Sequence, residues 1–211
     1  MKKRLYSIAF MFVLTFFFAA VVSAVKVHNE ERIQTNQQVK LQRIILKVLG
    51  VPADEKAPNR EVIQAFEKRV KAIEVKKQTL YVGYSEDGRS ITGYAFPVGG
   101  AGFWGPVYGM VSVDPEASKI LGIAFYRHSE TPGLGARITE PWFTKQFTGL
   151  PVFPVEGDKK IFHLKPAGSG KGPNQLDAIT GATGTSRAVE AFVNRDLDRF
   201  LRETWKLVNK G

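Results

Sequence analysis

The segment with the most chemical potential is DAITGATGTS, which occupies residues 177–186. It contains four hydroxyl side chains among small residues that let a backbone approach a ligand closely: Thr180, Thr183, Thr185 and Ser186. A helix is expected to open at the end of this segment, and the unpaired N–H groups at a helix start favour a phosphate. The residues also fit an ordinary N-cap, in which one Thr or Ser satisfies the first turn. Four hydroxyls exceed what one cap needs, so both interpretations stay open.

Two further segments could belong to the same site. ETPGLG, at residues 130–135, lies about fifty residues upstream, and its Pro-Gly and Leu-Gly pairs taken alone indicate only a turn after a strand. GFWGPVYG, at residues 102–109, contributes Trp104 and Tyr108. These two aromatic residues fit either a hydrophobic core or the wall of a pocket.

Together the segments resemble the FMN-binding domain family. Residues 177–186 look like the family's flavinylation motif, D-x-x-[ST]-G-A-T-x-[ST], in which a flavin transferase joins the phosphate of FMN to the last hydroxyl. The residues that match the motif before that hydroxyl are Asp177, Thr180, Gly181, Ala182 and Thr183. The resemblance therefore makes Thr185 the attachment residue, whereas Ser186 is one place out of register.

The ETPGLG segment is similar to a loop that this family places beside the flavin. The resemblance thus adds five residues to the cofactor site: Glu130, Thr131, Gly133, Leu134 and Gly135. The family includes an FMN-bearing subunit of the sodium-translocating NADH:quinone reductase and another of the Rnf electron-transport complex. Residues 102–109 look closer to the quinone reductase protein.

The resemblance implies an electron-transfer subunit of a membrane oxidoreductase, with covalent FMN as its cofactor. Other membrane subunits would be its partners, and a flavin transferase would act during maturation. Such a subunit carries electrons and is not a self-sufficient catalyst, so no catalytic residues are assigned. Two alternatives stay open: a stand-alone anchored flavoprotein reductase, and an exported binding or scaffold domain without flavin that uses residues 177–186 as a helix cap.

The N-terminal segment predicts how the chain is held. Leu5–Val25 is a run of 21 residues without a formal charge, and a helix of that length spans roughly 30 Å, the thickness of a bilayer's hydrocarbon core. The three basic residues before it (residues 2–4) predict a cytoplasmic N-terminus and a main domain on the other, periplasmic side. A cleaved signal peptide is the alternative, since residues 22–24 loosely resemble a cleavage site, but the apolar run is longer than the usual signal-peptide core.

Composition excludes other classes of function. The chain has no cysteine, which rules out thiolate metal sites, iron–sulfur ligation, disulfides and cysteine nucleophiles. Its three histidines are scattered without ligand spacing, so no metal site is predicted. Of the net charge of +10, residues 1–60 carry +6, with 10 Lys and Arg against 4 Asp and Glu. Because this excess gathers near the predicted membrane segment, nucleic-acid binding is not predicted.

Hydrophobic periodicity predicts the elements that position these segments. Apolar residues at helical spacing indicate helices over residues 27–49 and from Arg60 to about Val75, separated by a polar break at residues 53–59. Runs of period two then indicate four strands, at residues 80–84, 90–96, 107–113 and 120–127.

The C-terminal part adds a short helix within residues 140–148, with Pro141 in its first turn. A strand at residues 161–165, a loop at 167–175 and a helix from Ser186 to about Val208 follow. Few βαβ units are present, so we predict an α+β fold with a largely antiparallel sheet and flanking helices. The predicted parts are a cytoplasmic flank and transmembrane anchor (1–26), a helical stalk and linker (27–58) and an extracytoplasmic FMN-binding domain (59–211).

Overall fold

The computed structural model describes residues 2–52, 57–76, 78–170 and 172–208. The polar break predicted at residues 53–59 and the loop predicted at residues 167–175 therefore lie partly outside the described residues. The chain divides into two compact units, Met1–Leu41 and Gln42–Gly211.

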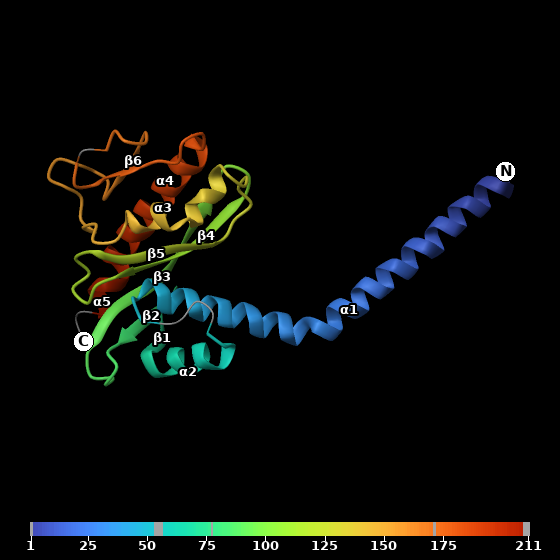
Figure 1. The fold of residues 1–211 in the computed structure, drawn as a ribbon, viewed down its shortest axis with the longest axis horizontal. Coiled ribbons are helices and arrows are strands. Elements are labelled where there is room, and N and C mark those ends of the chain that lie inside the picture. Colours follow the sequence, from blue (N-terminus) through green and yellow to red (C-terminus); the bar gives the residue numbers. More distant parts are fainter. Residues whose placement is uncertain (1, 53–56, 77, 171, 209–211) are drawn as a thin grey trace. The chain divides into compact units, whose positions relative to one another are not determined.

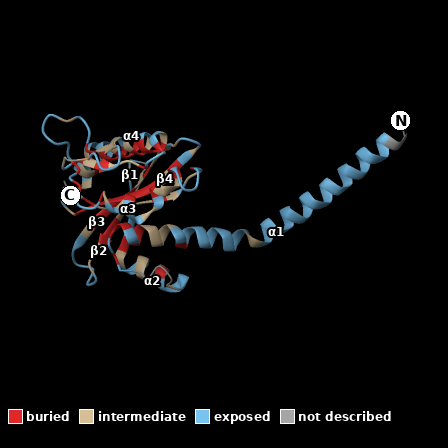
Figure 2. Ribbon diagram, turned by 45° about the horizontal axis from the view of Figure 1, so that its top comes forward, coloured by how far each residue is buried: buried red, intermediate tan, exposed pale blue. Residues whose placement is uncertain are grey.

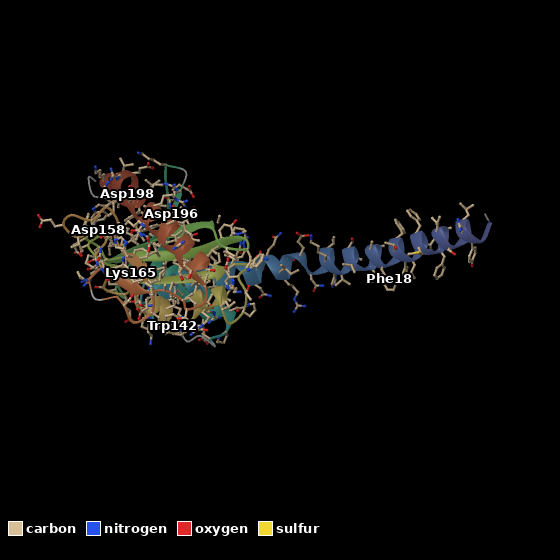
Figure 3. All side chains as sticks on the ribbon, turned by 90° about the horizontal axis from the view of Figure 1, so that it is seen from above. Phe18, Trp142, Asp158, Lys165, Asp196 and Asp198 are labelled. Carbon is tan, nitrogen blue, oxygen red and sulfur yellow. The ribbon has the colours of Figure 1, made fainter. Side chains whose placement is uncertain are left out.

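The first unit consists of most of helix α1, Lys2–Val48. The helix is continuous, so the helix predicted over residues 27–49 is part of a much longer one. From Arg4 onward it is long and apolar enough to cross a membrane, judged by length and composition. Figure 3 shows its apolar side chains, Phe18 among them, projecting from the ribbon. Gly50 follows the helix with a φ of +69°, a left-handed conformation typical of a helix end.

The second unit is built on a five-stranded antiparallel sheet in the order β1-β2-β3-β4-β5 (Figure 1). Its strands are β1 (Val70–Val75), β2 (Gln78–Tyr84), β3 (Ile91–Ala101), β4 (Pro106–Val113) and β5 (Ile120–Arg127). All neighbouring strands pair antiparallel. The predicted α+β fold with an antiparallel sheet is confirmed, and the four strands predicted from period two are β2 to β5.

Strand β1 corrects one prediction. Helix α2 spans Asn59–Arg69 and ends there, whereas the sequence predicted a helix to about Val75. Val70 has φ −133° and ψ 134°, an extended conformation, and the residues up to Val75 pair with β2. Residues 70–75 are rich in β-branched side chains, which suit a strand. Their helical spacing is overruled by the hydrogen bonds that β2 supplies.

Helices cover both faces of the sheet. Helix α4 (Thr183–Arg199) lies on one face, where a Cβ on Gly100 of β3 would run into the Phe192 side chain, and Phe96 stacks on Phe200 at 4.1 Å between ring centroids. The last turn of α1 lies on the other face, where the Ser112 hydroxyl of β4 donates to the carbonyl of Val48. Figure 2 shows the buried residues concentrated in the strands and in the side of α4 that meets them.

The remaining elements frame the site. A 3₁₀ helix (Gly135–Thr139) leads into α3 (Pro141–Lys145), which begins at the proline as predicted. Strands β6 (His163–Lys165) and β7 (Gln175–Asp177) form a small parallel sheet, of which only β6 was predicted. The last helix begins at Thr183, three residues earlier than predicted, and continues as a π-helix (Phe200–Trp205) and α5 (Lys206–Val208).

Candidate functional site

The first turn of α4 positions the hydroxyl of Thr185. The residue is only 3% exposed and is the third residue of the helix. Among the described residues, no side chain caps the start of α4, whose N-cap position is Ala182. The neighbouring Ser186 hydroxyl accepts the N–H of Ile179 at 3.1 Å and so braces the preceding turn. The ordinary cap interpretation therefore does not describe Thr185, whose hydroxyl points elsewhere.

That hydroxyl reaches a buried carboxylate. Thr185 Oγ1 donates to Glu130 Oε2 at 2.5 Å. The other carboxylate oxygen, Oε1, accepts the backbone N–H groups of Phe103 at 2.8 Å and Trp104 at 3.2 Å. Glu130 is 5% exposed. One side chain therefore ties together the three segments that the sequence singled out, although they lie far apart along the chain.

Glycines allow this close packing. A Cβ on Gly135 would lie 2.5 Å from both Thr185 Oγ1 and Glu130 Oε2, which is far inside van der Waals contact. A Cβ on Gly184 would overlap the Phe103 ring, and one on Gly102 would overlap Glu130 Oε1. At these positions any side chain would push the hydroxyl, the carboxylate or the aromatic ring aside.

A cavity of about 190 Å³ opens beside the hydroxyl. The side chains of Phe103, Trp104 and Leu134 line it while staying 61%, 68% and 44% exposed. The other lining residues come from the two motif segments: Glu130, Thr131, Gly135, Gly181, Ala182, Thr183, Gly184 and Thr185. Most of the predicted cofactor residues are thus brought together around one space.

The other predicted residues lie elsewhere. Thr180 lines a neighbouring cavity of about 460 Å³, which shares Gly181 and Thr183 with the first and is also lined by Arg187. Asp177 accepts the N–H of Gly168 at 2.8 Å through its carboxylate. Gly133 is a turn residue with φ +74° and open space where a Cβ would be.

Sequence reasoning did not assign Phe103 to the site and left Trp104 undecided between core and pocket wall. The structure makes Trp104 a wall residue, since it is exposed and lines the cavity. Tyr108 is half-buried beneath the guanidinium of Arg127, 4.1 Å from its ring centroid, and lines a different cavity. The available signal was two adjacent aromatic residues between glycines, a pattern that suits an exposed turn.

Comparison with known proteins places all three segments within one domain. Residues 102–198 match the family model of the FMN-binding domain. The resemblance predicted from the sequence is thereby confirmed. The Thr185–Glu130 contact, the cavity beside it and the exposed aromatic pair all lie inside this FMN-binding domain.

Curated relatives share this region. The chain is 36% identical over 115 residues to the NqrC subunit of the Na(+)-translocating NADH-quinone reductase of Neisseria meningitidis serogroup A, a match that covers 54% of this chain and 44% of that protein. It is 34% identical over 108 residues to the protein of the same name from Yersinia pestis, which covers 51% of this chain and 41% of that protein. The chain thus matches less than half the length of these relatives.

Solved structures share the fold more widely. A crystal structure of the same reductase subunit from Parabacteroides distasonis superposes with a TM-score of 0.69 at 25% identity, covering 82% of this chain and 95% of that one. A crystal structure of NqrC from Shewanella oneidensis has a TM-score of 0.63 at 24% identity, covering 76% and 90% respectively. The sheet and helices around the FMN-binding domain are therefore a fold already seen in NqrC.

Proposed function

We propose that this chain is a membrane-anchored electron-transfer subunit that carries FMN joined through its phosphate to Thr185. It would serve a membrane redox complex of the NADH:quinone reductase or Rnf type. The observation that carries the proposal is a single buried hydroxyl at the start of α4, which faces a cavity inside an FMN-binding domain. Its hydrogen is already held by a carboxylate.

The residues present fit the phosphate end of FMN. Binding sites that enclose a whole ligand have volumes of roughly 300–1,000 Å³, and the cavity at Thr185 measures about 190 Å³. A phosphate and the adjoining sugar-alcohol chain suit that space, with the glycines giving close access. The flavin ring would then lie against the exposed side chains of Phe103, Trp104 and Leu134, where a partner can reach it.

The charge of the cavity favours a covalent link over simple anion binding. No Lys or Arg is among the described residues that line it, and the buried carboxylate of Glu130 would repel a free phosphate. An ester to Thr185 retains the cofactor without a basic cradle. When bound, FMN supplies the redox chemistry, while the chain fixes its position and surroundings.

The first experiment measures the mass of the full-length protein matured in its native host. We expect an added FMN and flavin fluorescence that stays with the denatured protein in a gel. Thr185→Ala should abolish both signals, whereas Ser186→Ala should keep them, since that hydroxyl only braces the turn at Ile179. Fluorescence that persists in Thr185→Ala would move the attachment to another hydroxyl.

We also propose that α1 anchors the chain, with residues 1–26 as flank and membrane anchor, 27–58 as stalk and linker, and 59–211 as an FMN-binding domain outside the cytoplasm. The chain contains no cysteine, so a single cysteine reports on location without background. Glu86→Cys, in the exposed β2–β3 turn, should react with a membrane-impermeant maleimide in intact spheroplasts. Labelling only after permeabilisation would place the domain in the cytoplasm.

The proposed partners are other membrane subunits and, during maturation, a flavin transferase. Co-purification of the full-length protein with multi-span membrane proteins would support membership of a complex. Purification of a flavin-loaded chain alone, able to reduce a soluble acceptor, would favour a stand-alone anchored reductase.

A further inference from the structure

We propose that Glu130 prepares Thr185 for esterification, by holding the hydroxyl hydrogen and taking the proton as the phosphoester forms. The inference rests on the proposed attachment of FMN at Thr185. It concerns the reaction that loads the cofactor and assigns a chemical role to a residue of this chain, the acceptor protein, in addition to whatever the transferase supplies.

The geometry of the carboxylate favours this role. The N–H groups of Phe103 and Trp104 both bind Oε1 and fix the orientation of the group. Oε2 is thereby directed at Thr185 Oγ1, 2.5 Å away, which is within the reach that proton transfer requires. All three contacts are donors to the carboxylate, so it acts purely as an acceptor, as an ionised carboxylate does.

A purely structural role explains less. Two backbone N–H groups on one oxygen could be satisfied equally by the single carbonyl oxygen of a glutamine. A buried carboxylate is costly unless it is paired or hydrogen-bonded, and among the described residues no Lys or Arg forms an ion pair with Glu130. The second oxygen spends its contact on one hydroxyl, the one in register for attachment.

The reaction balances with the flavin donor as the only co-reactant. Thr185 Oγ1 attacks the flavin-side phosphorus of a flavin dinucleotide held by the transferase. The new O–P bond forms, the pyrophosphate bond breaks and a nucleoside monophosphate leaves, with no change of oxidation state. The hydrogen of Thr185 moves to Glu130 Oε2. The protonated carboxyl group can then donate to the ester, which removes the repulsion between two anions.

The test uses the full-length chain in detergent with purified flavin transferase and flavin adenine dinucleotide. Initial rates of covalent labelling are followed by in-gel fluorescence and intact mass at several concentrations of the chain, which separates kcat from KM. Glu130→Gln keeps an oxygen for the two N–H groups but cannot take a proton. We expect kcat to fall by about 10²-fold or more, the usual contribution of a general base, with KM close to wild type.

Glu140→Gln is the matched control. Its carboxylate binds Arg137 and Trp142 and has no contact with Thr185, so its labelling rate should stay close to wild type. Glu130→Asp keeps the charge but withdraws it by one methylene, and its rate should lie between those of wild type and Glu130→Gln. This second variant keeps the test decisive if the glutamine variant unfolds, which thermal melting would reveal.

The outcomes separate the two proposals. Wild-type chain that takes up no flavin, or Thr185→Ala that still does, would overturn the proposed attachment itself. Wild-type labelling with an unchanged kcat in folded Glu130→Gln, or a loss confined to KM, would overturn only the role of Glu130.

Discussion

Thr185 and Glu130 are joined by a 2.5 Å hydrogen bond although 55 residues separate them along the chain. Gly135 closes over this pair, because its missing side chain leaves room for both the hydroxyl and the carboxylate. Both side chains are almost completely buried. The contact therefore depends on how the 130–135 segment packs against the start of α4.

Gly135→Ala tests that packing. The new methyl group would lie 2.5 Å from Thr185 Oγ1 and Glu130 Oε2, so one of them must move. We expect a loss of about 1–3 kcal/mol in the free energy of unfolding, as for other overpacked sites, and slower covalent flavin labelling. Gly149→Ala is the control, since it strains a left-handed turn with φ +82° in open space. It should lower stability while leaving labelling intact; equal labelling in both variants would contradict the prediction.

Asp196 ties α4 to the sheet and should be far more important for stability than its neighbour Asp198. Its side chain is 7% exposed and accepts the N–H of Gly99 in β3 at 3.0 Å, beside Arg195 (Figure 3). Asp196→Ala should cost about 1.5–3 kcal/mol, the value of a hydrogen bond to a charged group. Asp198 is 54% exposed and pairs only with Arg202, so Asp198→Ala should cost less than about 0.5 kcal/mol. Urea unfolding in detergent would measure both, and similar losses would refute the prediction.

Acid should destabilise the fold through Asp114. Burial opposes ionisation of this carboxyl, but hydrogen bonds from the Ser118 hydroxyl and from the N–H groups of Lys119 and Ser118 outweigh it and lower its pKa below 3.8. A carboxyl with a lower pKa in the folded state contributes stability above its unfolded pKa and loses it below. Melting temperatures should therefore fall as the pH drops below about 4. Asp114→Asn should be less stable at neutral pH and show a shallower fall in acid; parallel curves would contradict this.

The Asp158 carboxyl should add to the same acid response. Its pKa is lowered by the N–H of Lys160 first, then by His163 and Asn174, which holds together the loop before β6. Because this pKa also lies below the unfolded value of 3.8, its stabilising effect disappears over the same acid range. Asp158→Asn combined with Asp114→Asn should flatten the acid response more than either change alone.

Thr92→Val should stabilise the protein. Thr92 Oγ1 is buried and, among the described residues, has no hydrogen-bond partner. Replacing it with a methyl group of similar shape removes a buried, unsatisfied hydroxyl, which costs about 1–3 kcal/mol. Thr79→Val is the control, since its hydroxyl donates to Glu74 at 2.7 Å and should be lost at a small cost. A decrease in the melting temperature of Thr92→Val would show that the hydroxyl is satisfied in solution.

The sequence by itself determined the elements whose signal is local. Period-two runs identified β2 to β5, Pro141 marked the start of α3, and the apolar N-terminal run indicated a single long helix. The motif at residues 177–186 was also visible, because an attachment hydroxyl and its small neighbours are adjacent in the chain. These features depend on side chains a few residues apart, which a sequence displays directly.

Only the tertiary structure decided the features that depend on distant partners. Residues 70–75 fit a helix by spacing, yet β2 offers them hydrogen bonds as a strand. Phe103 reaches the site because its N–H, like that of Trp104, binds the carboxylate of Glu130. The meeting of Glu130 with Thr185 likewise requires the sheet to carry one segment to the start of α4. Long-range hydrogen bonds and burial select among local preferences that are nearly equal in free energy, and a chain shows those contacts only once it is folded.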